Sequence, residues 1–484
     1  MHPNAAAVRI SDLSDFTAER RDWGRLTFVC AAILAFTGIF TCCCDTPMIW
    51  DGAYQFCFSL IKQRPYFYLT RFHSYLLWLP MVYLSRFTDN LTALKLAYGL
   101  PFTLAPAFSL CASWWIVRDR APRLILWAIF GVAAAPLPGQ IFIINDSIFQ
   151  QHMFWPVYLG LLVPLRIPQA IFLSLLVIFQ FSHQIGLLLL AAGGAAALLL
   201  AIRDRQNRNE LLFKAGILIP LAAIALWKIL HFPDSYAQRE FTWERIHESW
   251  QYGVEGYPLR GVLFMCGAGV AVLVHRLLRN QTWMRWRPGL FVIASLCLAG
   301  AMVNWTIWAL DSHKWSTAAN YRRWVVPLTI PFYLLAFLDR WFDREPSPDD
   351  SRRLSEFVGT CVALSFCLII SIQSMVWVRL TRHLLNDVES YPATIVPWSR
   401  ISWTRDTPLY HWGTTPYIFV LEGEKPRRLL LDPDQSDVRE QLRMLEQAPP
   451  QIPLSWFTPI SPIPGPAGWF DFRPMLYAIH HEKP

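Results

Sequence analysis

Two aspartates follow the first long apolar run of the chain at a spacing that suits acid–base catalysis or metal binding. Asp45 comes directly after the run 26–44, and Asp51 follows in Trp50-Asp51-Gly52-Ala53-Tyr54-Gln55. Two carboxylates so placed at a helix end can act as a general base and its orienting partner, or they can share a divalent metal ion. The same pair also fits ordinary loop acids at the end of a helix.

A third acid and two histidines stand between later apolar runs. Asp146 follows Asn145 and precedes Gln150, Gln151 and His152. An ionisable residue between apolar runs is a candidate for function, whereas Asn or Asp at this position is also a preferred helix N-cap. His183, beside Gln184, fits either a functional site or a hydrogen-bonded turn.

Two arginines precede a late apolar run in Asn320-Tyr321-Arg322-Arg323-Trp324-Val325-Val326-Pro327. The planar guanidinium group matches the oxygens of a phosphate, so Arg322 and Arg323 are candidates for holding a lipid-linked phosphate. The alternative is that both side chains reach toward ordinary lipid headgroups.

The composition predicts which elements position these residues. Of the 484 residues, 54% are hydrophobic and 16% are charged, whereas soluble proteins carry about a quarter charged residues. We therefore predict an all-α polytopic membrane protein with about eleven transmembrane helices. The expected spans are 26–44, 91–117, 124–144, 152–165, 167–181, 184–202, 211–230, 259–278, 288–310, 324–338 and 357–378.

The basic residues predict the topology. Arginines gather before the first run and in segments 118–123, 203–208, 276–287 and 340–353, with Arg166 between two runs. Because cytoplasmic loops are rich in Lys and Arg, we expect a cytoplasmic N-terminus and a tail outside the membrane. These loops account for most of the net charge of +8, so a nucleic-acid partner is not expected. The expected location is a bacterial cytoplasmic (inner) membrane.

The topology divides the chain into three parts. Residues 1–25 form a cytoplasmic segment, residues 26–378 the transmembrane domain and residues 379–484 an extracytoplasmic domain. In the first outer loop, 45–90, the aromatic stretch 65–84 contains Arg71, His73 and Pro80, so we expect helices at the outer membrane interface. In the tail, 417–421 predicts a strand and 436–447 a helix, which indicates a small α+β domain.

The order of these features resembles the GT-C superfamily of membrane glycosyltransferases, which includes oligosaccharyltransferases, protein O-mannosyltransferases and aminoarabinose transferases of lipid A. One span leads to a long outer loop with an early acid, Asp51 in Asp51-Gly52-Ala53-Tyr54. An aromatic membrane-hugging segment follows, and the second outer loop carries Asp146. A late inward span opens with Arg323-Trp324-Val325-Val326-Pro327, similar to the Arg-Tyr-x-x-Pro element of many members. The resemblance covers about residues 26–378.

The resemblance implies that a sugar moves from a polyprenyl-phosphate donor to a glycan, lipid or protein acceptor at the outer face of the membrane. Asp51 would activate the acceptor, with Asp45 and Asp146 in support. Arg322, Arg323 and Arg71 would hold the donor phosphate. The residues implied to line the cavity are Tyr54, His73, His152 and His183.

Two departures from the family pattern limit the implied chemistry. The second outer loop has one acid where metal-dependent oligosaccharyltransferases have a spaced pair, so the cofactor is either none or a divalent Mg or Mn ion on Asp51 and Asp146. The tail has no Trp-Trp-Asp motif, which argues against N-linked oligosaccharide transfer. A transporter or flippase of a lipid or amphipathic substrate is the alternative function. It should show repeat symmetry and ionisable residues near the membrane midplane.

Overall fold

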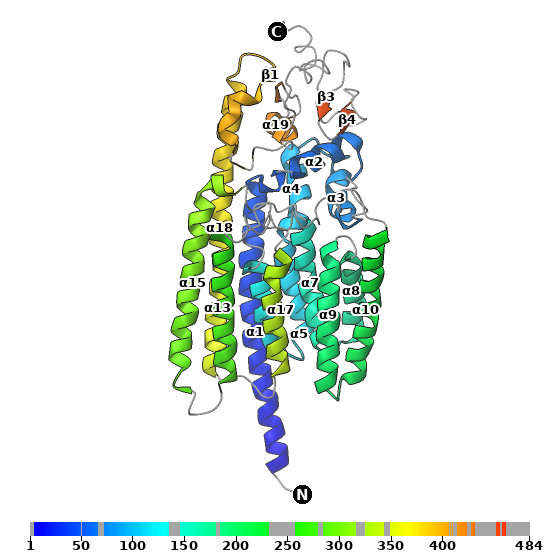
Figure 1. The fold of residues 1–484 in the computed structure, drawn as a ribbon, viewed down its shortest axis with the longest axis vertical. Coiled ribbons are helices and arrows are strands. Elements are labelled where there is room, and N and C mark those ends of the chain that lie inside the picture. Colours follow the sequence, from blue (N-terminus) through cyan, green and yellow to red (C-terminus); the bar gives the residue numbers. More distant parts are fainter. Residues whose placement is uncertain are drawn as a thin grey trace.

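A computed structural model gives the fold as a long bundle of helices, with the start of the first helix at one end and the labelled strands at the other (Figure 1). It describes residues 4–49, 51–65, 72–134, 146–180, 184–231, 257–278, 284–315, 325–342, 349–405, 407, 409, 414–423, 427–430, 452–454 and 457–460.

Residues 4–134 form nine helical elements in the described part of the chain. They are α1 (Asn4–Cys43), η1 (Thr46–Met48), α2 (Asp51–Lys62), α3 (Phe72–Leu84), α4 (Leu91–Thr103), α5 (Ala105–Val117), η2 (Pro122–Leu124), α6 (Ile125–Ile129) and the π-helical turn η3 (Phe130–Ala134). The side chain of Asn90 caps α4 by accepting a hydrogen bond from Ala93 N at 3.1 Å, which satisfies a donor that the first turn leaves free. The segment 45–90, predicted to be the first outer loop, contains two described helices, α2 and α3. α3 falls within the stretch 65–84 where helices were expected, whereas α2 lies before it.

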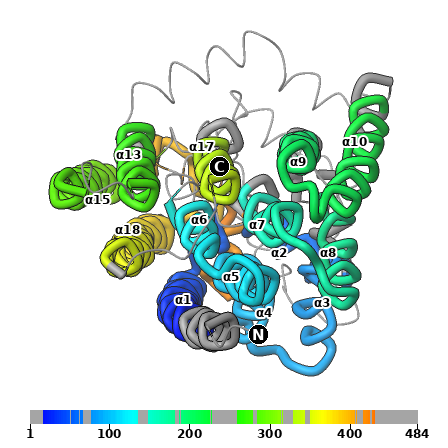
Figure 2. The backbone as a smooth tube through the Cα atoms, turned by 90° about the horizontal axis from the view of Figure 1, so that it is seen from below, coloured from blue at the N-terminus to red at the C-terminus, as the bar shows by residue number. Residues whose placement is uncertain are grey.

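Residues 146–389 continue the bundle. The helices of this part are α7 (Asp146–Leu162), α8 (Ile167–Gln180), α9 (Gln184–Arg203), α10 (Arg208–His231), α13 (Tyr257–Leu277), α15 (Arg287–Leu310), η5 (Ser312–Lys314), α17 (Val325–Trp341) and α18 (Asp349–Glu389). Viewed along the bundle, α13, α15 and α18 lie on one side and α8, α9 and α10 on the other, with α5, α6, α7 and α17 between them (Figure 2).

After α18 the chain forms short elements at its C-terminal end. They are β1 (Ile395–Val396), η6 (Trp398–Thr404), α19 (Thr414–Glu422), β2 (Leu429–Leu430), β3 (Ile452–Leu454) and β4 (Phe457–Ile460). β1 pairs with β2 in parallel, and β3 pairs with β4 antiparallel. The predicted strand at 417–421 is wrong, because this run lies in α19. A short apolar run buried on all sides has no period that separates strand from helix. The helix expected at 436–447 lies outside the described residues.

The all-α membrane character is supported, but the count of about eleven transmembrane helices is wrong for the described residues. Four helices there are long and apolar enough to cross a membrane, namely Thr17–Cys43, Leu259–Leu277, Arg287–Leu310 and Asp350–Glu389. A fifth results if α4 and α5, which are bent by 42°, count as one span. Some other apolar helices are shorter: α8, with 14 residues, is about 21 Å long, below the roughly 30 Å of a bilayer core.

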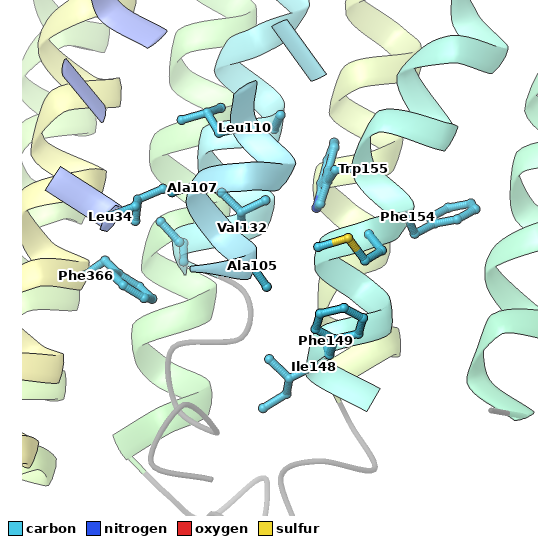
Figure 3. Close-up of a cluster of buried hydrophobic side chains, with 14 of the residues drawn as sticks. Leu34, Ala105, Ala107, Leu110, Val132, Ile148, Phe149, Phe154, Trp155 and Phe366 are labelled. Carbon is cyan, nitrogen blue, oxygen red and sulfur yellow. The ribbon is translucent and has the colours of Figure 1, made fainter. Parts of the chain in front are cut away.

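One continuous apolar core runs through the centre of the bundle. Figure 3 shows part of it, with Leu34 of α1 and Phe366 of α18 on one side of α5 and the aromatic side chains of α7 on the other. Trp155 of α7 is fully buried and lies against Gly131, where any side chain would overlap its indole ring. Glycine at this position of η3 therefore lets α7 approach the turn closely.

Ion pairs join the basic segments at the end of the bundle where α1 carries Arg20, which we call the basic end. Arg20 and Arg166 both pair with Asp119, at 3.0 and 3.2 Å. Further pairs of the same end are Arg352–Asp22, Arg340–Asp204, Arg276–Asp339 and Arg123–Asp339. These contacts connect segments that the sequence assigned to one side of the membrane. That this side faces the cytoplasm remains a prediction.

Candidate functional site

The candidate site lies at the opposite end of the bundle, where α1 turns into the segment that leads to α2. Asp45 has a left-handed backbone conformation with φ of 58°, which Asp tolerates better than most residues. Met48 N donates to Asp45 O at 2.9 Å and closes the turn of η1. The sharp turn redirects the chain from α1 into α2 at this end of the bundle (Figure 1).

The carboxylate of Asp45 is held by a lysine of α4. Lys95 Nζ donates to Asp45 Oδ2 at 2.6 Å, and both side chains are largely buried. A charge-assisted hydrogen bond of this length is stronger than a neutral one. The pair therefore fixes the turn after α1 onto α4 and keeps an acid at the end of the bundle opposite the basic end.

Asp51 is the first residue of α2, and the backbone beside it is anchored. The buried Tyr98 hydroxyl of α4 donates to Gly52 O at 3.0 Å, and the same hydroxyl lies 3.3 Å from Gln55 Oε1. Gly52 N in turn donates to Ile49 O. The start of α2 is thus fixed to α4 next to the position that carries the candidate acid. The side chain of Asp51 itself lies outside the described part.

Buried aromatic rings connect the start of α2 with the start of α7, and we call these rings the aromatic chain. The ring centroids of Phe56 and Tyr98 are 5.4 Å apart, and those of Tyr98 and Trp78 are 6.0 Å apart. Trp78 and Phe102 follow at 6.4 Å, and Phe102 meets Phe149 of α7 edge-on at 5.6 Å. Such pairs stabilise beyond their buried area. The aromatic chain therefore ties the helix that begins at Asp51 to the helix that begins at Asp146.

Polar side chains attach the same part of α7 to its neighbours. Gln150 Nε2 donates to Gln180 O of α8 at 2.7 Å, and Gln151 Nε2 donates to Thr329 Oγ1 of α17. Ser109 Oγ of α5 donates to the carbonyl of His152, whose own side chain is buried. Buried amide donors paired in this way hold helices in one register.

The structure describes some of the predicted site residues fully and others in part. Asp45, Tyr54 and His152 are described, and Tyr54 and His152 are buried. The positions of Asp51 and His73 in α2 and α3 are described without their side chains, and so is Asp146, the first residue of α7. Those outside the described residues altogether are Arg71, His183, Arg322 and Arg323. The cavity and the phosphate contacts stay predictions.

Sequence reasoning missed Lys95 and Tyr98. A signal for Lys95 existed, because it is a lone charge inside the otherwise apolar run 91–117, and such charges have a role by default. Tyr98 had no local signal, since an aromatic residue in a membrane helix is common. The contact between the tail and α2, described below, also had none, because it joins segments about 360 residues apart.

Acids begin or precede two helices that are held together by buried rings, and carboxylates are groups that can do acid–base chemistry. Among the described residues, no group of three or more His, Cys, Asp or Glu side chains could hold a metal ion. Comparison with protein-family models, curated proteins and solved structures gives no match for the chain.

Proposed function

We propose that the protein is a GT-C-like glycosyltransferase that moves a sugar from a polyprenyl-phosphate donor to an acceptor at the outer face of the cytoplasmic membrane. The observation that carries the proposal is the aromatic chain, which links the helix starting at Asp51 to the helix starting at Asp146. Asp45, paired with Lys95, belongs to the same end of the bundle.

The distribution of charge supports the proposed orientation. The ion-paired arginines gather at the basic end, whereas the candidate acids lie at the other end. If the basic end faces the cytoplasm, as the positive-inside rule predicts, the acids face the outer leaflet. A lipid-linked sugar presents its phosphate at such a membrane surface, where Arg322, Arg323 and Arg71 would bind it.

In the proposed reaction, Asp51 accepts a proton from the acceptor hydroxyl as its oxygen attacks the anomeric carbon. The bond between that carbon and the phosphate oxygen breaks, and its electron pair leaves with polyprenyl phosphate. The arginines stabilise the charge that develops on the phosphate. Asp45 and Asp146 would orient Asp51 or the substrate, and a divalent Mg or Mn ion on Asp51 and Asp146 stays a prediction of the resemblance.

The test is transfer from polyprenyl phosphate that carries radiolabelled glucose, galactose or mannose, with the protein in proteoliposomes and a membrane extract as acceptor source. Asp51→Asn should reduce the release of polyprenyl phosphate by about 100-fold or more, the usual range for losing a general base. Asp89→Asn, an exposed acid between α3 and α4, is the matched control and should keep wild-type activity.

Two outcomes would contradict the proposal. Normal turnover by a folded Asp51→Asn variant would remove the assigned role. Movement of the labelled lipid across the bilayer without loss of its sugar would favour the transporter alternative.

A further inference from the structure

The C-terminal tail returns to the candidate site through α19. α19 packs against α2, and the Cys57 thiol of α2 donates to Pro416 O at 3.5 Å (α19 and α2 in Figure 1). The next residue, Tyr417, is buried, and its ring stacks on Trp377 of α18 with the centroids 5.4 Å apart. A tail helix is therefore held between the helix that begins at Asp51 and the long helix α18.

Tyr417 also lies close to the turn that carries Asp45. Burial raises the pKa of the Tyr417 phenol well above its usual value, and the negative charge of Asp45 acts in the same direction. α18 reaches this turn one helical turn before Trp377, because Ser374 Oγ lies 3.4 Å from Thr46 Oγ1 of η1. α18, α19 and the Asp45 turn thus meet at one place.

Contacts within the tail fix α19 relative to α18. α18 has 41 residues and is about 60 Å long, so it extends well beyond a bilayer core of roughly 30 Å. On its last turns, Asp387 accepts a hydrogen bond from Trp403 Nε1 at 2.8 Å, and the Trp403 ring lies 4.3 Å from the His383 ring. β1 lies before α19 in the chain and β2 lies after it, so the pairing of these strands joins the chain on both sides of α19.

We propose that α19 is a positioning element of the active site, with Tyr417 as the positioning residue that holds α2 and the Asp45 turn in the geometry in which Asp51 works. This inference rests on the proposed function. α19 supplies no reacting group, and its effect passes through the backbone of α2. Misplacing a reacting group by about 1 Å can cost roughly 100-fold in rate, so a loosened α2 should slow turnover while the donor still binds.

The experiment compares Tyr417→Ala, Tyr417→Phe and Arg400→Ala with the wild type, all as full-length protein in lipid nanodiscs. Arg400 is an exposed residue of the same tail and serves as the control. Two quantities are measured: kcat and KM for labelled polyprenyl-phosphate sugar, and amide hydrogen exchange of α2. Tyr417→Ala should lower kcat by about 10- to 100-fold with KM changed less than about threefold, and it should speed exchange in α2.

Tyr417→Phe keeps the ring that stacks on Trp377, so kcat and exchange should return to within about threefold of the wild type. Unchanged exchange in α2 with unchanged kcat in Tyr417→Ala would overturn the inference, and so would a rise in KM with normal kcat. Absence of transfer by the wild type would refute the proposed function. The exchange data would then still decide whether α19 holds α2.

Discussion

Replacing Asp339 with asparagine should destabilise the protein strongly, because four elements of the basic end meet at this carboxylate. Arg276 Nη1 of α13 and Trp127 Nε1 of α6 each lie 2.8 Å from Asp339 Oδ2. Arg123 Nε of η2 lies 3.6 Å from Oδ1. The side chains of Asp339 and Arg276 are only 5% and 3% exposed. Asparagine keeps the shape of the side chain but removes the charge that two guanidinium groups share.

The expected loss follows from the burial of these groups. Removing one partner of a buried ion pair costs about 3–5 kcal/mol, because the remaining charge stays desolvated. Asparagine can still accept the hydrogen bond from Trp127, so we expect a loss of about 3 kcal/mol, at the lower end of that range. Asp22→Asn removes the more exposed pair with Arg352, formed at 3.2 Å, and should cost at most about 1 kcal/mol.

The assay is equilibrium unfolding by SDS titration in mixed micelles, followed by far-ultraviolet circular dichroism. Wild type, Asp339→Asn and Asp22→Asn are compared under the same conditions. A loss in Asp339→Asn no larger than that in Asp22→Asn would show that the buried cluster does not hold the helices of the basic end together. The reasoning from burial would then be refuted.

Two further predictions concern packing and pH. Gly131→Ala should cost about 1–3 kcal/mol or prevent folding, because its methyl group would overlap the Trp155 ring, whereas Gly216→Ala meets no atom within 4 Å and should be tolerated; unfolding in SDS compares the two, and equal stability would contradict the packing. Burial raises the pKa of Glu422 although two backbone amides donate to it. Because the pKa of Glu422 is raised in the folded state, the contribution of Glu422 to stability is complete below the ordinary glutamate pKa. This contribution is lost as pH rises through the raised pKa. Amide exchange in α19, corrected for intrinsic rates, should therefore speed up with pH in the wild type and not in Glu422→Gln. The same pH response in both proteins would exclude Glu422 as the group that causes it.

The helical membrane character was predictable because it depends on local composition. The run 26–44 carries no charge between Leu26 and Cys44, and α1 includes most of it. The number of full-length spans was not predictable, because hydropathy does not show where a helix breaks. Pro101 and Pro106 flank Leu104, and there one expected span divides into α4 and α5. Proline removes a helical hydrogen bond and favours such a break.

The candidate site was predictable only as a set of positions. The sequence shows that Asp45 and Asp51 follow the first run, but not that Lys95 holds one and Tyr98 anchors the backbone beside the other. These contacts join residues about 45–50 positions apart. The position of α19 on α2 depends on a still more distant contact, and long-range packing leaves no periodic signal in a single sequence.

The central claim is that the end of the bundle containing the starts of α2 and α7 binds a polyprenyl-phosphate lipid for sugar transfer. Cryo-electron microscopy of the protein in lipid nanodiscs, with and without polyprenyl phosphate, tests it most directly. We predict phosphate density at this end, in contact with Arg322 or Arg323 and facing Asp51. Density at the basic end or at the membrane midplane, or none at saturating lipid, would contradict the claim.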